Sequence, residues 1–386
     1  MLKEDVDSLL SSMIESFEGV SDLFFIVGKP PQVEAYGKLK PYPDDSPDAY
    51  LQPNKVEELA HFIMSGIERL HRDLANLGAC DCSYAIENFA RFRVNIFRQN
   101  GHHAIVMRKL NSQIPSMDKI GLQPIFREII KEKTGIVFVT GATGSGKTTT
   151  LAAMLNEINR SEEIHVVTLE DPIEFLHPHA RATFSQRELG RDFPDFAAGL
   201  RSALRQAPKL ILVGEIRDRE TMEIALTAAE TGHIVFSTLH TINAGQTINR
   251  ILGMFSKDEE QQVRQRLVDT LRFVVSQRLI PRVGGGRLMI NEIMGSSLRT
   301  REALLLGEGE GRSYVDIIEA SHTYGWQTFD QALIEAFEKE LIEEETAMIF
   351  GSSKSKVRQG MDCVKKVRGA AAETPEEFKL KLYHTG

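Results

Sequence analysis

Residues 135–150 constrain this chain more than any other part of its sequence. Residues 136–139 form a run of apolar and β-branched residues typical of a buried strand. After Thr149, apolar residues recur at helical spacing up to residue 159. Between them lies Gly141-x-x-x-x-Gly146-Lys147-Thr148, the phosphate-binding loop pattern. A strand, a glycine loop and a helix in this order predict a nucleotide site in an α/β domain.

Each residue type in the loop has a physical role. Glycines let the backbone turn tightly and direct several N–H groups at a phosphate, and the helix N-terminus adds partial positive charge. We expect Lys147 to reach the β- and γ-phosphates of ATP, and the Thr148 hydroxyl to bind Mg²⁺. The predicted nucleotide-binding residues here are Thr143, Gly144, Ser145, Gly146, Lys147, Thr148 and Thr149. The alternative is a glycine-rich turn that binds nothing.

Composition narrows the class of protein. The 386 residues suggest two domains, and 42% hydrophobic with 26% charged residues is ordinary for a soluble globular protein. A net charge of −8 argues against a general nucleic-acid binder. Three cysteines provide neither a disulfide framework nor a zinc pattern, so we expect a cytoplasmic protein. No apolar run is long enough to span a bilayer, so any membrane role should come through a partner.

Three further apolar runs each end in polar residues. Residues 164–169, 210–213 and 233–239 are expected strands, followed by acidic residues or by a histidine. The alternation of strands with helices predicts a parallel sheet covered on both faces, and such a sheet binds its ligand at the carboxyl edge of the strands. The predicted site residues at this edge are Glu170, Asp171, Glu174, Glu215 and His240.

These polar residues have alternative roles. Glu215 is expected to activate water or act on Mg²⁺, and the alternative is a carboxylate that caps the helix opening at Asp218. Glu170, Asp171 and Glu174 could hold Mg²⁺ through water, pair with arginines or simply cap a helix. His240 could sense the γ-phosphate, although a lone histidine is usually structural.

The first 110 residues predict a smaller α+β domain. A helix is expected over residues 2–17, strands over 22–27, 32–36 and 39–41, and one or two helices over 55–77. Residues 80–86, 91–98 and 103–110 are expected strands of an antiparallel sheet with an arginine-rich face. Arg93 and Arg108 on that face are either solvated or act on a nucleotide held by a neighbouring subunit. The expected boundaries are 1–110, a linker over 111–122, a nucleotide domain over 123–350 and a peripheral helix or tail over 351–386.

Several motifs together resemble the ATPases of type II secretion and type IV pilus systems. The matching pieces are Gly141-Ala-Thr-Gly-Ser-Gly-Lys-Thr-Thr149, Leu169-Glu-Asp-Pro-Ile-Glu-Phe175, Gly214-Glu-Ile-Arg-Asp218, Ala229-Glu-Thr-Gly-His233 and Ser237-Thr-Leu-His-Thr241. They are similar to the Walker A, Asp box, Walker B and His box motifs of that family. Within it, the retraction ATPases of twitching motility, the PilT/PilU type, are the nearest likeness. One departure is Lys209, where the family usually has an acidic residue.

The resemblance implies an architecture and a set of roles. It implies a homohexameric ring whose subunits combine a PAS-like N-terminal domain with a RecA-like domain, a P-loop NTPase fold. Glu215 matches the glutamate that activates water, His233 and His240 match the His box, and Arg93 and Arg108 match arginines that approach nucleotide in trans. Glu170 and Thr148 are the implied Mg²⁺ contacts. The implied partners are further copies of the chain, an inner-membrane pilus platform protein and a paralogous retraction ATPase. The chain itself is expected in the cytoplasm, at the periphery of the inner membrane.

Other functions remain open at this point. A pilus assembly or secretion ATPase is disfavoured because those proteins usually carry a tetracysteine zinc module, whereas the second half of this chain has only Cys363. A RecA-like nucleic-acid motor is disfavoured by the acidic charge and by the lack of a stripe of base-stacking aromatic residues. A third alternative is an accessory retraction subunit that works only beside a paralogous ATPase.

Overall fold

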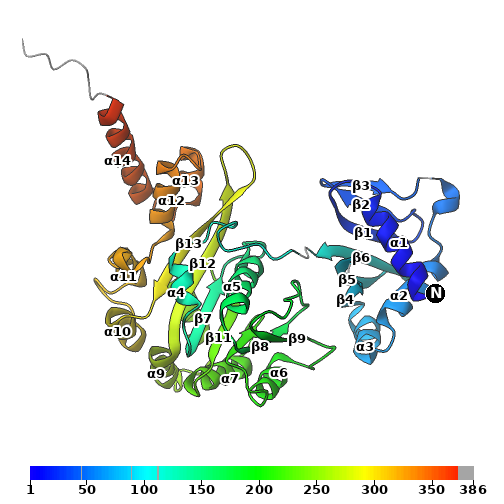
Figure 1. Ribbon diagram of the computed structural model, residues 1–386, viewed down its shortest axis with the longest axis horizontal. Coiled ribbons are helices and arrows are strands. Elements are labelled where there is room, and N and C mark those ends of the chain that lie inside the picture. Colours follow the sequence, from blue (N-terminus) through cyan, green and yellow to red (C-terminus); the bar gives the residue numbers. More distant parts are fainter. Residues whose placement is uncertain (45, 88, 111–112, 373–386) are drawn as a thin grey trace, which may run out of the picture. The chain divides into compact units, whose positions relative to one another are not determined.

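The computed structural model describes residues 1–44, 46–87, 89–110 and 113–372 (Figure 1). The chain divides into two compact units, one formed by residues 1–116 with 155–214, the other by residues 117–154 with 215–386. Helices and strands are mixed in both, which confirms the predicted α/β class. The predicted domain boundaries stay a prediction, and residues 111–112 of the linker and 373–386 of the tail lie outside the described residues.

The N-terminal part is an antiparallel sheet with helices packed on it. Its six strands follow the order β3-β2-β1-β6-β5-β4, and each neighbouring pair is antiparallel. The elements are α1 (Lys3–Glu15), β1 (Val20–Ile26), β2 (Gln32–Ala35), β3 (Lys38–Pro41), the 3₁₀ turn η1 (Pro47–Ala49), α2 (Pro53–Met64), α3 (Glu68–Leu77), β4 (Ala79–Ile86), β5 (Ala90–Gln99) and β6 (His102–Leu110). Each helix and strand predicted in this part is present.

Strand β5 shows how the sequence pattern sets the faces of this sheet. Phe92, Val94 and Ile96 are fully buried in a core shared with α1, α2 and α3, whereas Arg93 is exposed. Successive side chains of a strand point to opposite faces, so the alternation fixes which face carries the arginines. The predicted arginine-bearing face is therefore confirmed.

The second sheet has seven strands in the order β13-β12-β7-β11-β10-β8-β9. The strands are β7 (Gly135–Thr140), β8 (His165–Glu170), β9 (Thr183–Glu188), β10 (Leu210–Val213), β11 (Ile234–Leu239), β12 (Leu271–Pro281) and β13 (Arg287–Gly295). Strand β7 is parallel to β11 and β12, β8 is parallel to β9 and β10, and β13 is antiparallel to β12. The four predicted strands are confirmed.

The sequence analysis missed β9 and the β12–β13 hairpin. Polar residues stand in the middle of both regions: Gln186 and Arg187 in β9, and Ser276 and Gln277 in β12. They interrupt the apolar runs by which the other strands are recognised. Every residue of β7, β10 and β11 is buried, as expected for parallel strands covered on both faces.

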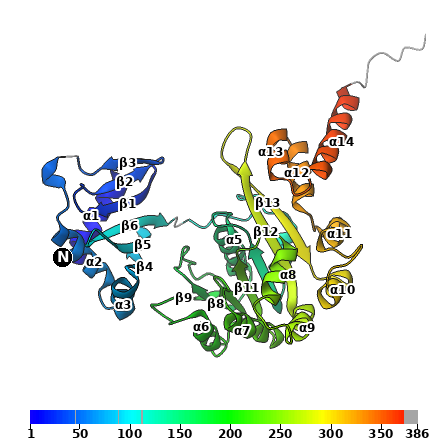
Figure 2. The same cartoon turned by 180° about the vertical axis from the view of Figure 1, so that it is seen from behind.

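Helices follow the strands of this sheet, and Figure 2 shows α8 on the side turned away in Figure 1. They are α4 (Ile125–Ile129), α5 (Lys147–Ser161), α6 (Phe196–Ala203), α7 (Arg219–Glu230), α8 (Ala244–Leu252) and α9 (Glu260–Thr270). Asp195, Asp218 and Asn243 cap α6, α7 and α8, each side chain accepting a backbone N–H three residues on. Among the described residues, none of the helices combines the length and apolar character needed to cross a bilayer.

The C-terminal helices pack on β12 and β13. They are α10 (Leu298–Leu306), α11 (Tyr314–Glu319), the 3₁₀ turn η2 (His322–Tyr324), α12 (Phe329–Glu338), α13 (Glu344–Phe350) and α14 (Lys354–Ala372). The Arg278 guanidinium lies 3.7 Å from the centre of the Phe329 ring and donates to the Phe350 carbonyl at 2.7 Å. The buried Asp330 carboxylate accepts the N–H groups of Ser352 and Ser353 at 2.6 and 2.9 Å, just before α14 begins. These contacts hold α12 to α14 against the sheet.

Two valines of α14 give a matched test of this packing. Val357 is fully buried against the C-terminal cluster, whereas Val367 is 69% exposed. We expect Val357→Ala to destabilise the C-terminal helices by about 2 kcal/mol, because two buried methyl groups are lost and a cavity remains. Val367→Ala should change the stability by less than about 0.5 kcal/mol. Hydrogen exchange of the α12–α14 amides measures both, and equal protection in the two variants would contradict the docking of α14.

Candidate nucleotide-binding site

The turn between β7 and α5 requires glycine at defined positions. Gly141, Gly144 and Gly146 have φ angles of +145°, +78° and +91°, a region that residues with a Cβ rarely adopt. A Cβ on Gly141 would stand 2.5 Å from the Ser145 Oγ and 2.6 Å from the Gln277 carbonyl oxygen. A Cβ on Gly144 would meet open space. The backbone is therefore packed tightly at the start of the loop and open at its centre, where N–H groups can receive an anion.

The side chains of the loop differ in exposure. Lys147 is buried, and its ammonium donates to the carbonyl oxygens of Gly141 and Ala142 at 2.9 and 3.0 Å. The Ser145 hydroxyl is buried and has no hydrogen-bond partner among the described residues. Thr143, Gly144 and Thr148 are exposed, and Gly146 and Thr149 are half-buried. The predicted binding residues thus lie together around the start of α5.

Glu215 lies just after β10 in the same compact unit as the loop. Its side chain is 14% exposed and forms an ion pair with Arg217. The His240 Nε2 lies 3.4 Å from the Glu215 Oε2, a buried oxygen that accepts no hydrogen bond among the described residues. The structure therefore brings Glu215 and His240 together, as the sequence analysis expected. Arg217 was missed, although it stands inside the Gly214-Glu-Ile-Arg-Asp218 motif.

The capping alternative for Glu215 does not fit the structure. Asp218 is the N-cap of α7, where its carboxylate accepts the Thr221 N–H at 2.8 Å and the Thr221 hydroxyl at 2.9 Å. The first turn of α7 therefore already has its cap. Glu215 has one oxygen on Arg217, while its Oε2 lies 3.4 Å from the His240 Nε2 and accepts no hydrogen bond among the described residues, an arrangement suited to holding a water molecule.

Glu170 lies at the carboxyl end of β8, in the other compact unit. The Thr168 hydroxyl and the Gln186 amide donate to its Oε1 at 2.6 and 3.1 Å. Burial raises the pKa of Glu170 to about 7, while these two hydrogen bonds act to lower it and the nearby Glu174 raises it further. Asp171 is exposed and Glu174 is half-buried. Gln186 was missed because β9 was missed.

His233 lies at the start of the strand whose other end leads to His240, as the sequence pattern predicted. His240 follows β11, whereas His233 precedes it, and the Gly135 N–H at the start of the parallel β7 donates to the His233 carbonyl. The strand between the two histidines spans roughly 20 Å, since each residue adds about 3.3 Å. The His233 ring nitrogen Nδ1 lies 3.1 Å from the Ala228 carbonyl. The contact of His233 with nucleotide stays a prediction, and within this subunit His233 lies at the edge opposite to His240.

Lys209 also lies at the amino edge of the strands. Its exposed side chain precedes β10, and its backbone N–H donates to the carbonyl of His165 at the start of β8. Glu215 follows the opposite end of β10. The departure from the family pattern at Lys209 therefore leaves the carboxyl edge unchanged.

Arg93 and Arg108 stand directly opposite each other on β5 and β6. Arg93 is exposed, and Arg108 is 70% exposed and donates to the buried Asp22 carboxylate at 2.8 Å. Two guanidinium groups side by side on an exposed face form a local positive surface. The predicted arginine face thus has its two named members adjacent.

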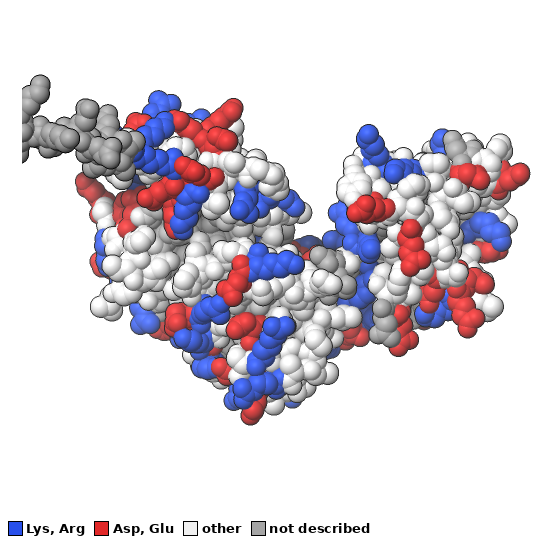
Figure 3. Space-filling model, turned by 45° about the horizontal axis from the view of Figure 1, so that its top comes forward, with Lys and Arg blue, Asp and Glu red and all other residues white. Residues whose placement is uncertain are grey.

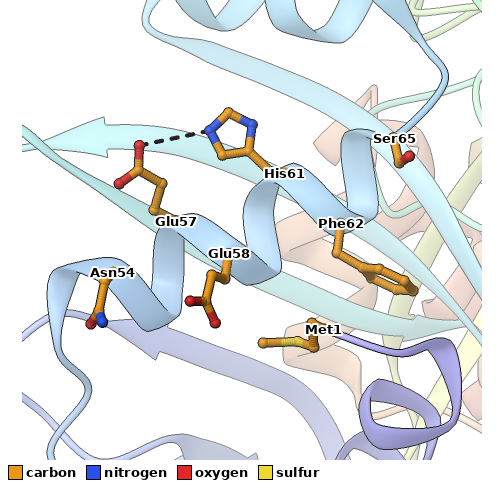
Figure 4. A pocket seen from close by; sticks show the side chains of 7 residues that line it. All are labelled: Met1, Asn54, Glu57, Glu58, His61, Phe62 and Ser65. Carbon is orange, nitrogen blue, oxygen red and sulfur yellow. Dashed lines mark ion pairs between the residues drawn. The ribbon is translucent and has the colours of Figure 1, made fainter.

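A separate hollow in the N-terminal part contains none of the predicted residues. It measures about 570 Å³ and lies beside α2 (Figure 4), lined by Met1, Asn54, Glu57, Glu58, His61, Phe62 and Ser65. His61 lies 3.7 Å from the Glu57 carboxylate. Among the described residues no group of His, Cys, Asp or Glu is arranged to hold a metal ion by itself. The glycine loop with Glu215 and His240 is therefore the candidate site.

Comparisons with known proteins agree with this geometry. Residues 82–322 match the family described as type II/IV secretion system protein, and the chain belongs to that family. It is 40% identical to the type IV pilus retraction ATPase PilT of Pseudomonas aeruginosa, over 89% of this chain and 97% of PilT. It is 35% identical to the type IV pilus ATPase PilU of the same organism, over 92% of this chain and 90% of PilU.

A solved structure extends the similarity to the fold. The crystal structure of the pilus retraction motor PilT with bound ADP superimposes with a TM-score of 0.81 at 37% identity, over 93% of this chain and all of that one. The predicted fold, a RecA-like P-loop NTPase domain with a smaller PAS-like N-terminal domain, is confirmed. PilT and PilU are both ATPases of type IV pili, as the resemblance of the sequence motifs implied.

The buried Glu170 gives a pH test of the site. Its folded pKa lies above that of an unfolded glutamate, so the native state binds more protons between about pH 4.5 and 7 and loses stability as the pH rises through that window. Glu170→Gln removes this titration, and at pH 8 it should be more stable than wild type by about 1–3 kcal/mol, a difference that vanishes near pH 4.

Chemical denaturation at pH 4, 6 and 8, without nucleotide, measures this difference. The control is Glu163→Gln, because the Glu163 side chain is 76% exposed and its loss should not depend on pH in this way. A Glu170→Gln effect that is constant across the three pH values would contradict the assignment.

Proposed function

We propose that this chain is the ATP-hydrolysing subunit of a homohexameric ring that drives retraction of type IV pili. The observation that carries the proposal is the grouping of the glycine loop, Lys147, Glu215 and His240 in one compact unit. Similarity to PilT and PilU over about nine-tenths of the chain supports the pilus system as the setting.

The loop residues fit a nucleotide phosphate. The centre of the loop is open at Gly144, and Ser145 carries a buried hydroxyl without a partner. The Lys147 ammonium is hydrogen-bonded to two loop carbonyls, and it can turn from them toward a phosphate oxygen. Thr143 to Thr149 bind and orient the phosphates through N–H groups, hydroxyls and the N-terminus of α5.

Thr148 is the Mg²⁺ contact that the loop's own compact unit can supply, and Glu170, in the other unit, stays the contact that the family resemblance implies. Mg²⁺ keeps several waters and uses one or two protein oxygens together with phosphate, so a group of three protein ligands is unnecessary. The Thr148 hydroxyl is exposed at the start of α5, and the Glu170 carboxylate is held in place by Thr168 and Gln186. When bound, Mg²⁺ neutralises charge that develops on the phosphates. Asp171 and Glu174 add negative charge nearby.

Glu215 is the residue that activates water. Its buried Oε2 can accept a proton from a water, while Arg217 fixes the other oxygen. His240, 53% exposed, stands on the open side of this carboxylate and can donate to a phosphate oxygen. A positioned carboxylate of this kind contributes on the order of a hundredfold or more to a hydrolysis rate.

The remaining steps involve neighbouring subunits. Arg93 and Arg108 of one subunit approach the nucleotide of the next and offset transition-state charge, and the described part of the linker, residues 113–122, acts as the hinge. The motion acts on an inner-membrane pilus platform protein, beside which a paralogous retraction ATPase works, so the ring operates in the cytoplasm at the membrane periphery. On the face shown in Figure 3, basic and acidic side chains are intermingled, which agrees with a protein rather than a nucleic-acid partner.

Glu215→Gln tests the catalytic assignment. It keeps the size of the side chain but removes the base, so Mg²⁺-dependent ATP hydrolysis should fall by on the order of a hundredfold or more. Glu223→Gln, on an exposed position of α7, is the matched control and should retain wild-type activity. Hydrolysis that survives Glu215→Gln would overturn Glu215 as the base, and no hydrolysis by folded wild-type hexamers would overturn the autonomous motor.

Mixing two inactive variants tests the role of Arg93 in trans. Arg93→Ala and Lys147→Ala should each hydrolyse ATP poorly as pure hexamers. In an equal mixture that has exchanged subunits, about a quarter of the sites pair an intact loop with an intact arginine of the neighbour, because ring contacts are head-to-tail. Activity should reappear in the mixture. Arg98→Ala, exposed on the same strand, should remain active alone. A mixture as inactive as its parts would place the arginine function elsewhere.

A further inference from the structure

Gln277 is a buried amide in the middle of β12 and belongs to the same compact unit as the glycine loop. It is 1% exposed. Its Nε2 donates to the Thr150 hydroxyl at 2.8 Å and to the Asn291 Oδ1 at 3.3 Å, whereas its Oε1 has no partner among the described residues. A buried polar group is costly unless it is hydrogen-bonded, so an amide retained here calls for an explanation.

One end of this amide meets the phosphate loop. Thr150 is fully buried in the first turn of α5, two residues after the predicted Mg²⁺ contact Thr148. The backbone carbonyl of Gln277 lies 2.6 Å from where a Cβ on Gly141 would stand. In addition, Ser276 pairs with Thr140 across β12 and β7, and their hydroxyls lie 2.9 Å apart. Backbone and side chain of one β12 segment thus touch both sides of the loop.

The same amide nitrogen also connects, through Asn291, to the segment that enters the nucleotide-binding unit. Asn291 on β13 is fully buried, and its Nδ2 donates to the Gln123 Oε1 at 3.0 Å. Gln123 opens the turn into α4, where its carbonyl accepts the Phe126 N–H at 3.1 Å. Thr150, Gln277, Asn291 and Gln123 therefore form one chain of hydrogen bonds within one compact unit.

Planar amide groups and a hydroxyl with restricted rotation keep a fixed orientation, so a movement of one group is passed to its hydrogen-bonded neighbour. If Thr150 moves, Gln277 can follow only by giving up its buried hydrogen bonds, because at 1% exposure bulk water does not reach the amide to replace them. In the same way, Asn291 and Gln123 would each lose a buried hydrogen bond if the neighbouring group moved alone.

We propose that Gln277 is a positioning residue that sets the phosphate loop through Thr150 and joins it through Asn291 to Gln123. This inference rests on the proposed nucleotide function of the loop. Gln277 does not touch the reacting atoms in this arrangement. It holds the start of α5 in the geometry that binds phosphate, and it ties that geometry to the segment leading into α4.

Nucleotide affinity of the full-length hexamer tests the proposal, with a fluorescent ADP as the probe. Gln277→Met keeps the volume but removes the hydrogen bonds, and should weaken ADP binding by roughly five- to tenfold. Thr150→Val should have a similar effect, and Thr150→Ser, which keeps the hydroxyl, should bind as wild type does. The double variant Gln277→Met/Thr150→Val should bind no more weakly than either single variant, because both remove the same contact.

Gln327→Met provides a control for a purely structural role. Gln327 is another buried amide of the same unit, and its Nε2 donates to the Asn291 carbonyl at 3.0 Å, but it does not touch the loop. It should lower the unfolding midpoint without changing ADP affinity. Gln123→Met, at the far end of the chain of hydrogen bonds, should weaken ADP binding by roughly twofold.

The possible outcomes distinguish failure of the positioning role of Gln277 from failure of the proposed nucleotide site. Wild-type affinity in Gln277→Met, or an equal loss in Gln327→Met, would overturn the positioning role while leaving the nucleotide site intact. Additive losses in the double variant would overturn the direct contact with Thr150. A wild-type hexamer that does not bind ADP would instead overturn the proposed function of the loop itself.

Discussion

The approach of two backbones at Gly141 underlies the arrangement of the site. The loop leaves β7 with a positive φ and passes so near the Gln277 carbonyl that only glycine fits. A side chain at this position would push β7 and β12 apart at their carboxyl ends, and the turn into α5 would lose its shape. The centre of the loop remains open because its start is packed against a neighbouring strand. The capacity to receive a phosphate thus depends on a contact made by residues more than a hundred positions apart in the chain.

Helix capping and side-chain hydrogen bonds determine the surroundings of two carboxylates of the site, Glu215 and Glu170. Asp218 caps α7, so Glu215 is not needed there, and its Oε2 accepts no hydrogen bond in the described structure although His240 lies 3.4 Å away. Glu170 is fixed by a hydroxyl on its own strand and an amide from the next, and its burial raises its pKa. Both carboxylates are therefore held in states that water or a cation would stabilise. Such groups do not stabilise the folded chain by themselves, but they suit a site that binds a charged ligand.

The sequence predicted those parts of the site that are encoded locally. The apolar run of β7, the glycine pattern and the helical spacing of α5 are contiguous, and each was recognised. Strand β12 could not be recognised, because Ser276 and Gln277 carry polar groups that only tertiary contacts explain. The two histidines of one motif were both assigned to the site, but the six-residue strand β11 separates them and carries them to opposite edges of the sheet. The motif supplied the residue types, whereas the position of each histidine relative to β7 follows from the register of β11 against that strand.

The cross-strand pair of Arg93 and Arg108 has a consequence for a single subunit. Like charges placed directly opposite each other on a sheet repel, and among the described residues Arg108 forms an ion pair with the Asp22 carboxylate. An anion approaching this face would therefore reduce the repulsion between the two arginines. If the nucleotide of a neighbouring subunit is that anion, as proposed, its binding to this face should weaken as the salt concentration rises.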